Sequence, residues 1–170
     1  IGLGIPAEPL FRSSIKLIFA VSAFLAFSAC NSEKPDFLYR GLSTSLPLNV
    51  FIDSLAHRGF VVDSAAAPDS TGRVVVLKSP TEKYHVLLGQ ADGVIQAVQE
   101  NWVLSTNDST RRMWQTLRDD FEKESGAWPN CPILKDDHKV AKFELERGFV
   151  TITLKNTYTP TLNVLYELKK

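Results

Sequence analysis

The chain has 170 residues, which is enough for one ordinary domain with short appendages. It carries 19 Lys and Arg residues against 19 Asp and Glu residues, and its 44% hydrophobic content is typical of a globular protein. A protein that grips nucleic-acid phosphates needs an excess of basic residues, so this balance argues against a nucleic-acid partner.

Residues 12–29 have the layout of a secretory signal. Arg12 and Lys16 form a short positive region, and the eleven residues 17–27 are apolar apart from Ser22. Such a helix rises about 16 Å, which is about half of the ~30 Å hydrocarbon core of a bilayer. A cleaved signal peptide therefore fits better than a membrane-spanning helix. Because position 1 is Ile, residues 1–11 are interpreted as part of a fragment or of a misread start.

The end of this segment, AFSAC at residues 26–30, resembles the lipobox of bacterial lipoproteins, with Phe27 where Leu is commonest. In that family the cysteine thiol receives a diacylglycerol, the signal is cut just before the cysteine, and the new amino terminus is usually acylated. The resemblance implies a signal peptide over residues 1–29 and lipidation of Cys30. Several acyl chains are needed because one chain anchors a protein only marginally. The alternative is an uncleaved, buried helix with Cys30 in the core.

The residue after the cysteine is Asn31 and not Asp. By the sorting rule known for enterobacterial lipoproteins, this implies the outer membrane of a Gram-negative bacterium, on its periplasmic or its surface face. Residues 30–36 are expected to comprise the lipidated cysteine and a short polar linker. A single folded domain is expected over residues 37–170.

The first helix is predicted within SLPLNVFIDSLAHRGF, residues 45–60. Ser45 is its candidate cap, Pro47 suits the first turn, and Gly59 is a natural stop. Apolar residues recur there at the i, i+3, i+4, i+7 spacing of one helix face: Leu48, Phe51, Ile52 and Leu55. FVVD begins an extended segment, and strands are predicted over residues 73–78, 83–89 and 94–104.

The second helix is predicted over residues 105–126, with its cap between Ser105 and Asp108 and its end at Gly126. Its apolar stripe consists of Met113, Trp114, Leu117 and Phe121. The AWPNCP segment that follows is interpreted as a loop. Three alternating strands close the chain over residues 140–146, 149–155 and 161–169. Such alternation predicts an antiparallel sheet with one dry and one wet face.

The predicted fold class is α+β, with two helices packed on one face of an antiparallel sheet in the order helix–strands–helix–strands. GLSTSLPLNVFIDSLAHRGF at residues 41–60, together with the Trp114, Leu117, Phe121, Gly126 and Trp128 pattern, resembles small uncharacterised envelope lipoproteins of Bacteroides-type bacteria. The layout is also similar to β-lactamase inhibitor proteins and to the small lipoprotein of the outer-membrane barrel-assembly machinery. Both are binding modules without catalysis, although a shared fold does not by itself imply a shared function.

The sequence lacks the residue patterns of known catalytic and metal sites. His57, His85 and His138 show no ligand spacing, and no nucleophile elbow, P-loop or dinucleotide fingerprint occurs in residues 37–170. Cys131 is better explained as a free thiol than as a nucleophile served by His138. We therefore expect no enzyme activity, no cofactor and no metal.

Exposed aromatic residues are the remaining signal, and Trp128 and Tyr158 are the candidate binding residues. Trp128 lies in a loop beside prolines, where its ring is available for contact. The leading hypothesis is a membrane-anchored lipoprotein that binds another envelope protein through its sheet or loops. The alternative is a lipoprotein that binds a glycan or another small ligand through exposed aromatic residues.

Overall fold

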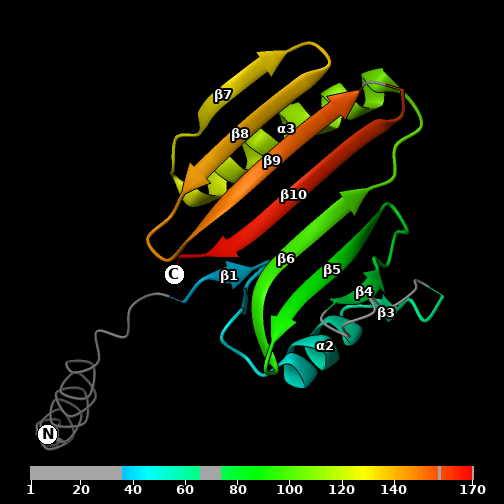
Figure 1. Cartoon of the computed structure of the whole chain (residues 1–170), viewed down its shortest axis with the longest axis vertical. Helices are drawn as coiled ribbons and strands as arrows, with labels where there is room; N and C mark the ends of the chain where they lie inside the picture. The colour runs from blue at the N-terminus through cyan, green and yellow to red at the C-terminus, as the bar shows by residue number, and fades with distance from the viewer. Residues whose placement is uncertain (1–35, 66–73, 157, 170) are drawn as a thin grey trace, which may run out of the picture. The chain divides into compact units, whose positions relative to one another are not determined.

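The computed structural model describes residues 36–65, 74–156 and 158–169, which form an α+β domain with two helices and a large antiparallel sheet (Figure 1). The predicted α+β class is thus confirmed. The signal segment and Cys30 lie outside the described residues. The helices are α2 (Leu48–Ala56) and α3 (Asn107–Ser125). The strands are β1 (Leu38–Tyr39), β2 (Leu42–Ser43), β3 (Val61–Val62), β4 (Val74–Lys78), β5 (Tyr84–Ala91), β6 (Val94–Trp102), β7 (Asn130–Lys135), β8 (His138–Glu144), β9 (Gly148–Asn156) and β10 (Pro160–Leu168).

The main sheet consists of two antiparallel meanders joined by the last strand of the chain. Its strand order is β3-β4-β5-β6-β10-β9-β8-β7, and β1 pairs with β2 as a separate hairpin. Strand β10 lies between β6 and β9 and is antiparallel to both. Because β10 joins the two meanders, residues about 60 positions apart in sequence become neighbours on one sheet face.

Two elements differ from the sequence prediction. The β1–β2 hairpin precedes α2, so the described part of the chain does not begin with a helix. Strand β7 forms where a loop was predicted, and it contains Pro132. Proline is tolerated there because β7 is the last strand of the sheet, and the register between β7 and β8 shifts between Asn130 and Ile133.

The predicted cap of the first helix is wrong. Pro47 occupies the N-cap position of α2 without any side-chain cap bond, and the Ser45 hydroxyl instead donates to Asp36 Oδ1 at 3.3 Å. The predicted stop is confirmed, since Gly59 has a φ of +86°, a conformation that favours glycine.

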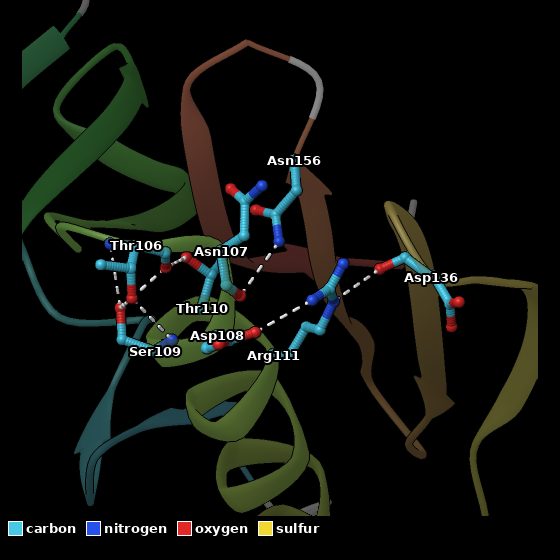
Figure 2. A network of polar contacts seen from close by, with 8 residues as sticks. All are labelled: Thr106, Asn107, Asp108, Ser109, Thr110, Arg111, Asp136 and Asn156. Atoms are coloured by element: carbon cyan, nitrogen blue, oxygen red, sulfur yellow. Dashed lines mark hydrogen bonds and ion pairs between the residues drawn. The ribbon is translucent and has the colours of Figure 1, made fainter.

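The predicted limits of the second helix are confirmed, and Figure 2 shows its N-terminus. Thr106 Oγ1 accepts a hydrogen bond from the Ser109 backbone N–H at 3.1 Å, and Ser109 Oγ accepts one from the Thr106 N–H at 3.2 Å. Asn156 of β9 donates through Nδ2 to the Asn107 carbonyl at 3.2 Å. Gly126 ends the helix in the left-handed conformation. These contacts hold α3 to one end of the sheet.

The core lies on one face of the sheet. Residues paired across antiparallel strands share a face, and two rows of buried residues run across five strands. These rows are Val86, Glu100, Val164, Ile152 and Ala141, and next to it Leu88, Val98, Tyr166, Val150 and Phe143.

Helix α3 packs on this face in contact with β9 and β10, and it runs behind β8 and β9 in the view of Figure 1. Its Trp114 indole donates to the Ile152 carbonyl at 3.2 Å, and the Phe121 ring lies 4.7 Å from the Phe143 ring. Helix α2 buries Phe51 and Leu55. Phe51 contacts the Tyr39 ring, which meets Tyr166 of β10 edge-on at 5.1 Å. The β1–β2 hairpin therefore contributes to the same core as the helices.

Candidate functional site

The face of the sheet opposite the core carries mixed polar and apolar side chains; we call it the open face. Its residues are exposed or half-buried, in agreement with the predicted wet face. Two rows of paired residues define it: His85, Asn101, Asn163, Thr153 and Val140, and next to them Leu87, Gln99, Leu165, Thr151 and Lys142. The combination of amide and hydroxyl groups with aliphatic side chains is suited to contact with another macromolecule.

The core face contains a buried carboxylate that the sequence analysis did not single out. Glu100 is 1% exposed, and three side chains donate to it. Tyr39 Oη and Arg40 Nε donate to Oε1 at 3.0 and 2.8 Å, and Trp102 Nε1 donates to Oε2 at 3.0 Å. A buried carboxylate is costly unless it is paired and hydrogen-bonded, and here both conditions are met.

The β1–β2 turn delivers Arg40 to this carboxylate. Arg40 and Gly41 have φ values of +49° and +77°, and a two-residue type I′ turn requires positive φ at both positions. The Arg40 guanidinium lies 5.1 Å from the centre of the Tyr84 ring and 5.9 Å from that of the Tyr39 ring. Arg40 donates a single hydrogen bond to Glu100, and its side chain is 41% exposed.

Burial and the charge of Glu100 both change the acidity of the tyrosines around this cluster. Burial raises the pKa of Tyr39 far above its usual value, and the Glu100 charge raises it further. The same two causes, in the same order, raise the pKa of Tyr166. Both phenols therefore stay protonated in the folded protein over the physiological pH range.

A cavity of about 640 Å³ opens beside this cluster. The β1–β2 segment contributes Phe37 and Arg40, α3 contributes Phe121 and Glu124, and the sheet contributes Glu100 and Tyr166. This volume lies within the range of small-molecule sites in proteins. The cavity is therefore lined by apolar, charged and hydrogen-bonding side chains.

The two aromatic residues predicted to bind a ligand lie far apart. Trp128, 83% exposed, follows the C-terminus of α3, whereas the fully exposed Tyr158 lies in the β9–β10 turn. That turn is next to the N-terminus of α3, because Asn156 bonds to Asn107 there. The 19 residues of α3 rise about 28 Å, so the two rings do not share one small-ligand site.

Trp128 and Tyr158 are therefore two separate candidate binding positions. Trp128 borders a shallow hollow of about 370 Å³ together with charged side chains of α3, among them Arg118 and Glu122.

Cys131 is a half-buried free cysteine in β7. Within the described residues, no group of three or more His, Cys, Asp and Glu side chains is placed to hold a metal ion.

No helix in the described ranges is long and apolar enough to cross a membrane. No protein-family model, no curated protein and no solved structure matches the chain.

Proposed function

We propose that the chain is a lipid-anchored, non-enzymatic protein of the outer membrane of a Gram-negative bacterium that binds another envelope protein through its open face. The observation that carries this proposal is the one-sided construction of the sheet. The helices and the β1–β2 hairpin pack on the core face, whereas the open face presents half-buried Leu87 and Leu165 among amide and hydroxyl groups. Interfaces between proteins combine such apolar centres with hydrogen-bonding groups.

The order of the elements supports a binding role by analogy. From α2 onward the chain runs through one helix, the four strands β3 to β6, a second helix and the four strands β7 to β10. Apart from the β1–β2 hairpin, we take this order as support, by analogy, for a role like that of the non-catalytic binding modules that the sequence resembles. The analogy concerns the fold, and the proposal depends on the open face.

Lipidation of Cys30 would keep the domain close to the bilayer. Five residues lie between Cys30 and Asp36, the first described residue, so the two are six residue steps apart, and a fully extended chain spans at most about 3.6 Å per step. The first described residue would therefore be held within about 22 Å of the acylated cysteine. A partner within this reach is a protein embedded in the same membrane or attached to it.

Site-specific photo-crosslinking in intact cells tests the proposal. A photoreactive residue at Thr151, on β9 between Leu165 and Lys142 of the open face, should capture one dominant envelope protein. The matched control is the same residue at exposed Thr116 on α3, which should capture none. Cys30→Ser should abolish the product formed from Thr151, because it removes the acceptor of the lipid. Equal products from both positions, or none from Thr151, would contradict the proposal.

Glycan or small-ligand binding at Trp128 is the alternative. It is favoured by the 83% exposure of this indole beside a hollow that has charged walls, since sugars stack on exposed indoles and bond to charged groups. This role requires a saturable change of tryptophan fluorescence with envelope glycans that the Trp128→Ala variant loses. A crosslinked protein at Thr151 together with an unchanged fluorescence would exclude it.

A further inference from the structure

We propose that the cavity between α3 and the β1–β2 hairpin is a binding site for a small organic cation, an amine or guanidinium group carried on an apolar body. The cavity opens on the core face of the sheet and is separate from the open face, so this site is independent of the function proposed above. Its residues come from segments distant in sequence, among them Phe37, Phe121 and Tyr166.

The Tyr166 hydroxyl is the first indication of a ligand. Tyr166 is 9% exposed and lines the cavity, yet its hydroxyl makes no hydrogen bond with a described residue. A polar atom without a hydrogen bond is either enclosed by protein or open to accessible space. Among the described residues, the enclosed side-chain atom without a partner is Asn156 Oδ1, so the Tyr166 hydroxyl must be open to accessible space. That space is the cavity. A phenol oxygen can accept a hydrogen bond from an ammonium or guanidinium N–H.

The charge of the cavity wall indicates the sign of the ligand. Arg40 is paired with Glu100 at 2.8 Å, and Arg147 with Asp36 at 3.3 Å. The remaining charged residues of the wall are three carboxylates with no partner in the described part of the chain: Asp120, Glu124 and Glu146. A concave surface with an excess of one charge concentrates ions of the opposite charge. A cation is therefore favoured over an anion.

Glu124 and Tyr166 together define where the cationic group would lie. Both residues line the cavity, and besides burial and Glu100 the charge of Glu124 raises the pKa of Tyr166, whereas the Arg40 charge lowers it. An ammonium group between the two would neutralise Glu124 and supply the hydrogen-bond donor that the hydroxyl lacks. The Glu124 carboxylate and the Tyr166 hydroxyl would then each gain a hydrogen-bond or ionic partner.

The apolar side chains that line the cavity indicate that the ligand carries an apolar body. Phe37, Leu117, Phe121 and Val164 line the cavity, and the Phe37 and Phe121 rings lie 6.5 and 6.4 Å from the Tyr166 ring. Aromatic faces attract cations as well as apolar groups. An arylalkylamine satisfies both parts of the wall, and so does the side chain of a lysine next to an aromatic residue in a peptide.

Isothermal titration calorimetry on the full chain in mild detergent tests the proposal, with phenethylamine as the amine and phenylacetate as the anion of similar shape. Phenethylamine should bind saturably and phenylacetate should not. Glu124→Gln and Tyr166→Phe should each weaken phenethylamine binding about fivefold or more. The matched control is Glu122→Gln, which removes the same charge from the same helix at a residue outside the cavity and should change the affinity less than about twofold.

A second titration distinguishes a free amine from a lysine side chain of a protein partner as the source of the cation. Acetyl-Phe-Lys-amide carries the same chemistry as a peptide side chain, and tighter binding of this peptide than of phenethylamine would assign the site to a partner's basic residue. Tighter phenethylamine binding would assign it to a free amine. Glu124 is exposed, so Glu124→Gln leaves the fold intact. Absence of saturable heat with both probes, stronger binding of phenylacetate, or equal weakening by Glu122→Gln would overturn the proposal.

Discussion

Glu100 shows how a single residue of this protein depends on contacts distant in sequence. Its carboxylate lies on the core face of β6, between Val98 and Trp102, where an ionised group would be costly without partners. Arg40, 60 positions earlier, is the one cationic donor to it among the described residues. The left-handed conformation of Arg40, unfavourable for a residue other than glycine, is maintained by this ion pair and by the turn.

A double-mutant cycle should measure this coupling. Arg40→Met keeps the aliphatic stem but removes the charged donor. We expect the free energy of unfolding to fall by about 1–2 kcal/mol. This loss is smaller than for a fully buried ion pair, because the Arg40 side chain is 41% exposed. Glu100→Gln should cost less in the Arg40→Met background than in the wild type, with a coupling of about 1 kcal/mol. Urea unfolding monitored by circular dichroism gives all four values. Additive single effects would show that the pair contributes nothing.

At the scale of elements, the sequence predicted α3 well because its signals are local. A cap hydroxyl, an apolar stripe and a terminal glycine lie within one segment. Strands β1 and β2 have two residues each and show no periodicity, and Pro132 made β7 resemble a loop although an edge strand accepts proline. The cluster around Glu100 was missed for a related reason. Its one local signal was an acidic residue at an inward position of an alternating strand, and its partners come from a distant turn.

Thr106, the observed cap of α3, and Ser45, the residue predicted to cap α2, provide a matched test of this contrast. Thr106→Ala should lower the free energy of unfolding by about 1 kcal/mol, because it removes the acceptor for the Ser109 N–H. Ser45→Ala should change it by less than about 0.5 kcal/mol, because Ser45 makes no cap bond and its hydroxyl contacts exposed Asp36. Thermal and urea unfolding of both variants give the comparison. An equal cost for both would mean that the Thr106 contacts contribute little to α3.

At the scale of the whole molecule, the sheet separates two surfaces that can act independently. The cavity opens beside the core face, where Glu100 and Tyr166 lie, and the open face carries Gln99 and Leu165, their neighbours in sequence. Alternation along β6 and β10 sends adjacent residues to opposite faces. A ligand in the cavity therefore leaves the open face free for a protein partner. Charge changes at Glu124 should affect amine binding without changing crosslinking at Thr151.

The same one-sided core makes the stability of the molecule sensitive to alkaline pH. Tyr39 and Tyr166 are buried on the core face, and their pKa values are raised in the folded state, first by burial and then by the Glu100 charge. Below about pH 10, the ordinary pKa of tyrosine, both phenols are protonated in the folded and the unfolded chain, and this contribution to stability is fully present. Above it the unfolded chain releases protons that the folded protein retains, so the free energy of unfolding falls as pH rises.

Each such tyrosine should contribute a slope of about −1.4 kcal/mol per pH unit above pH 10. Urea unfolding at intervals from pH 8 to pH 11 measures the total slope, to which lysines also contribute. The Tyr166→Phe variant isolates one tyrosine: because the hydroxyl has no partner in the described residues, its loss should change stability little at pH 8. The same variant should then lose stability less steeply than the wild type by about 1.4 kcal/mol per pH unit above pH 10. Parallel curves for the two proteins would mean that Tyr166 ionises in the folded state, with its hydroxyl more open to water than its buried position on β10 implies.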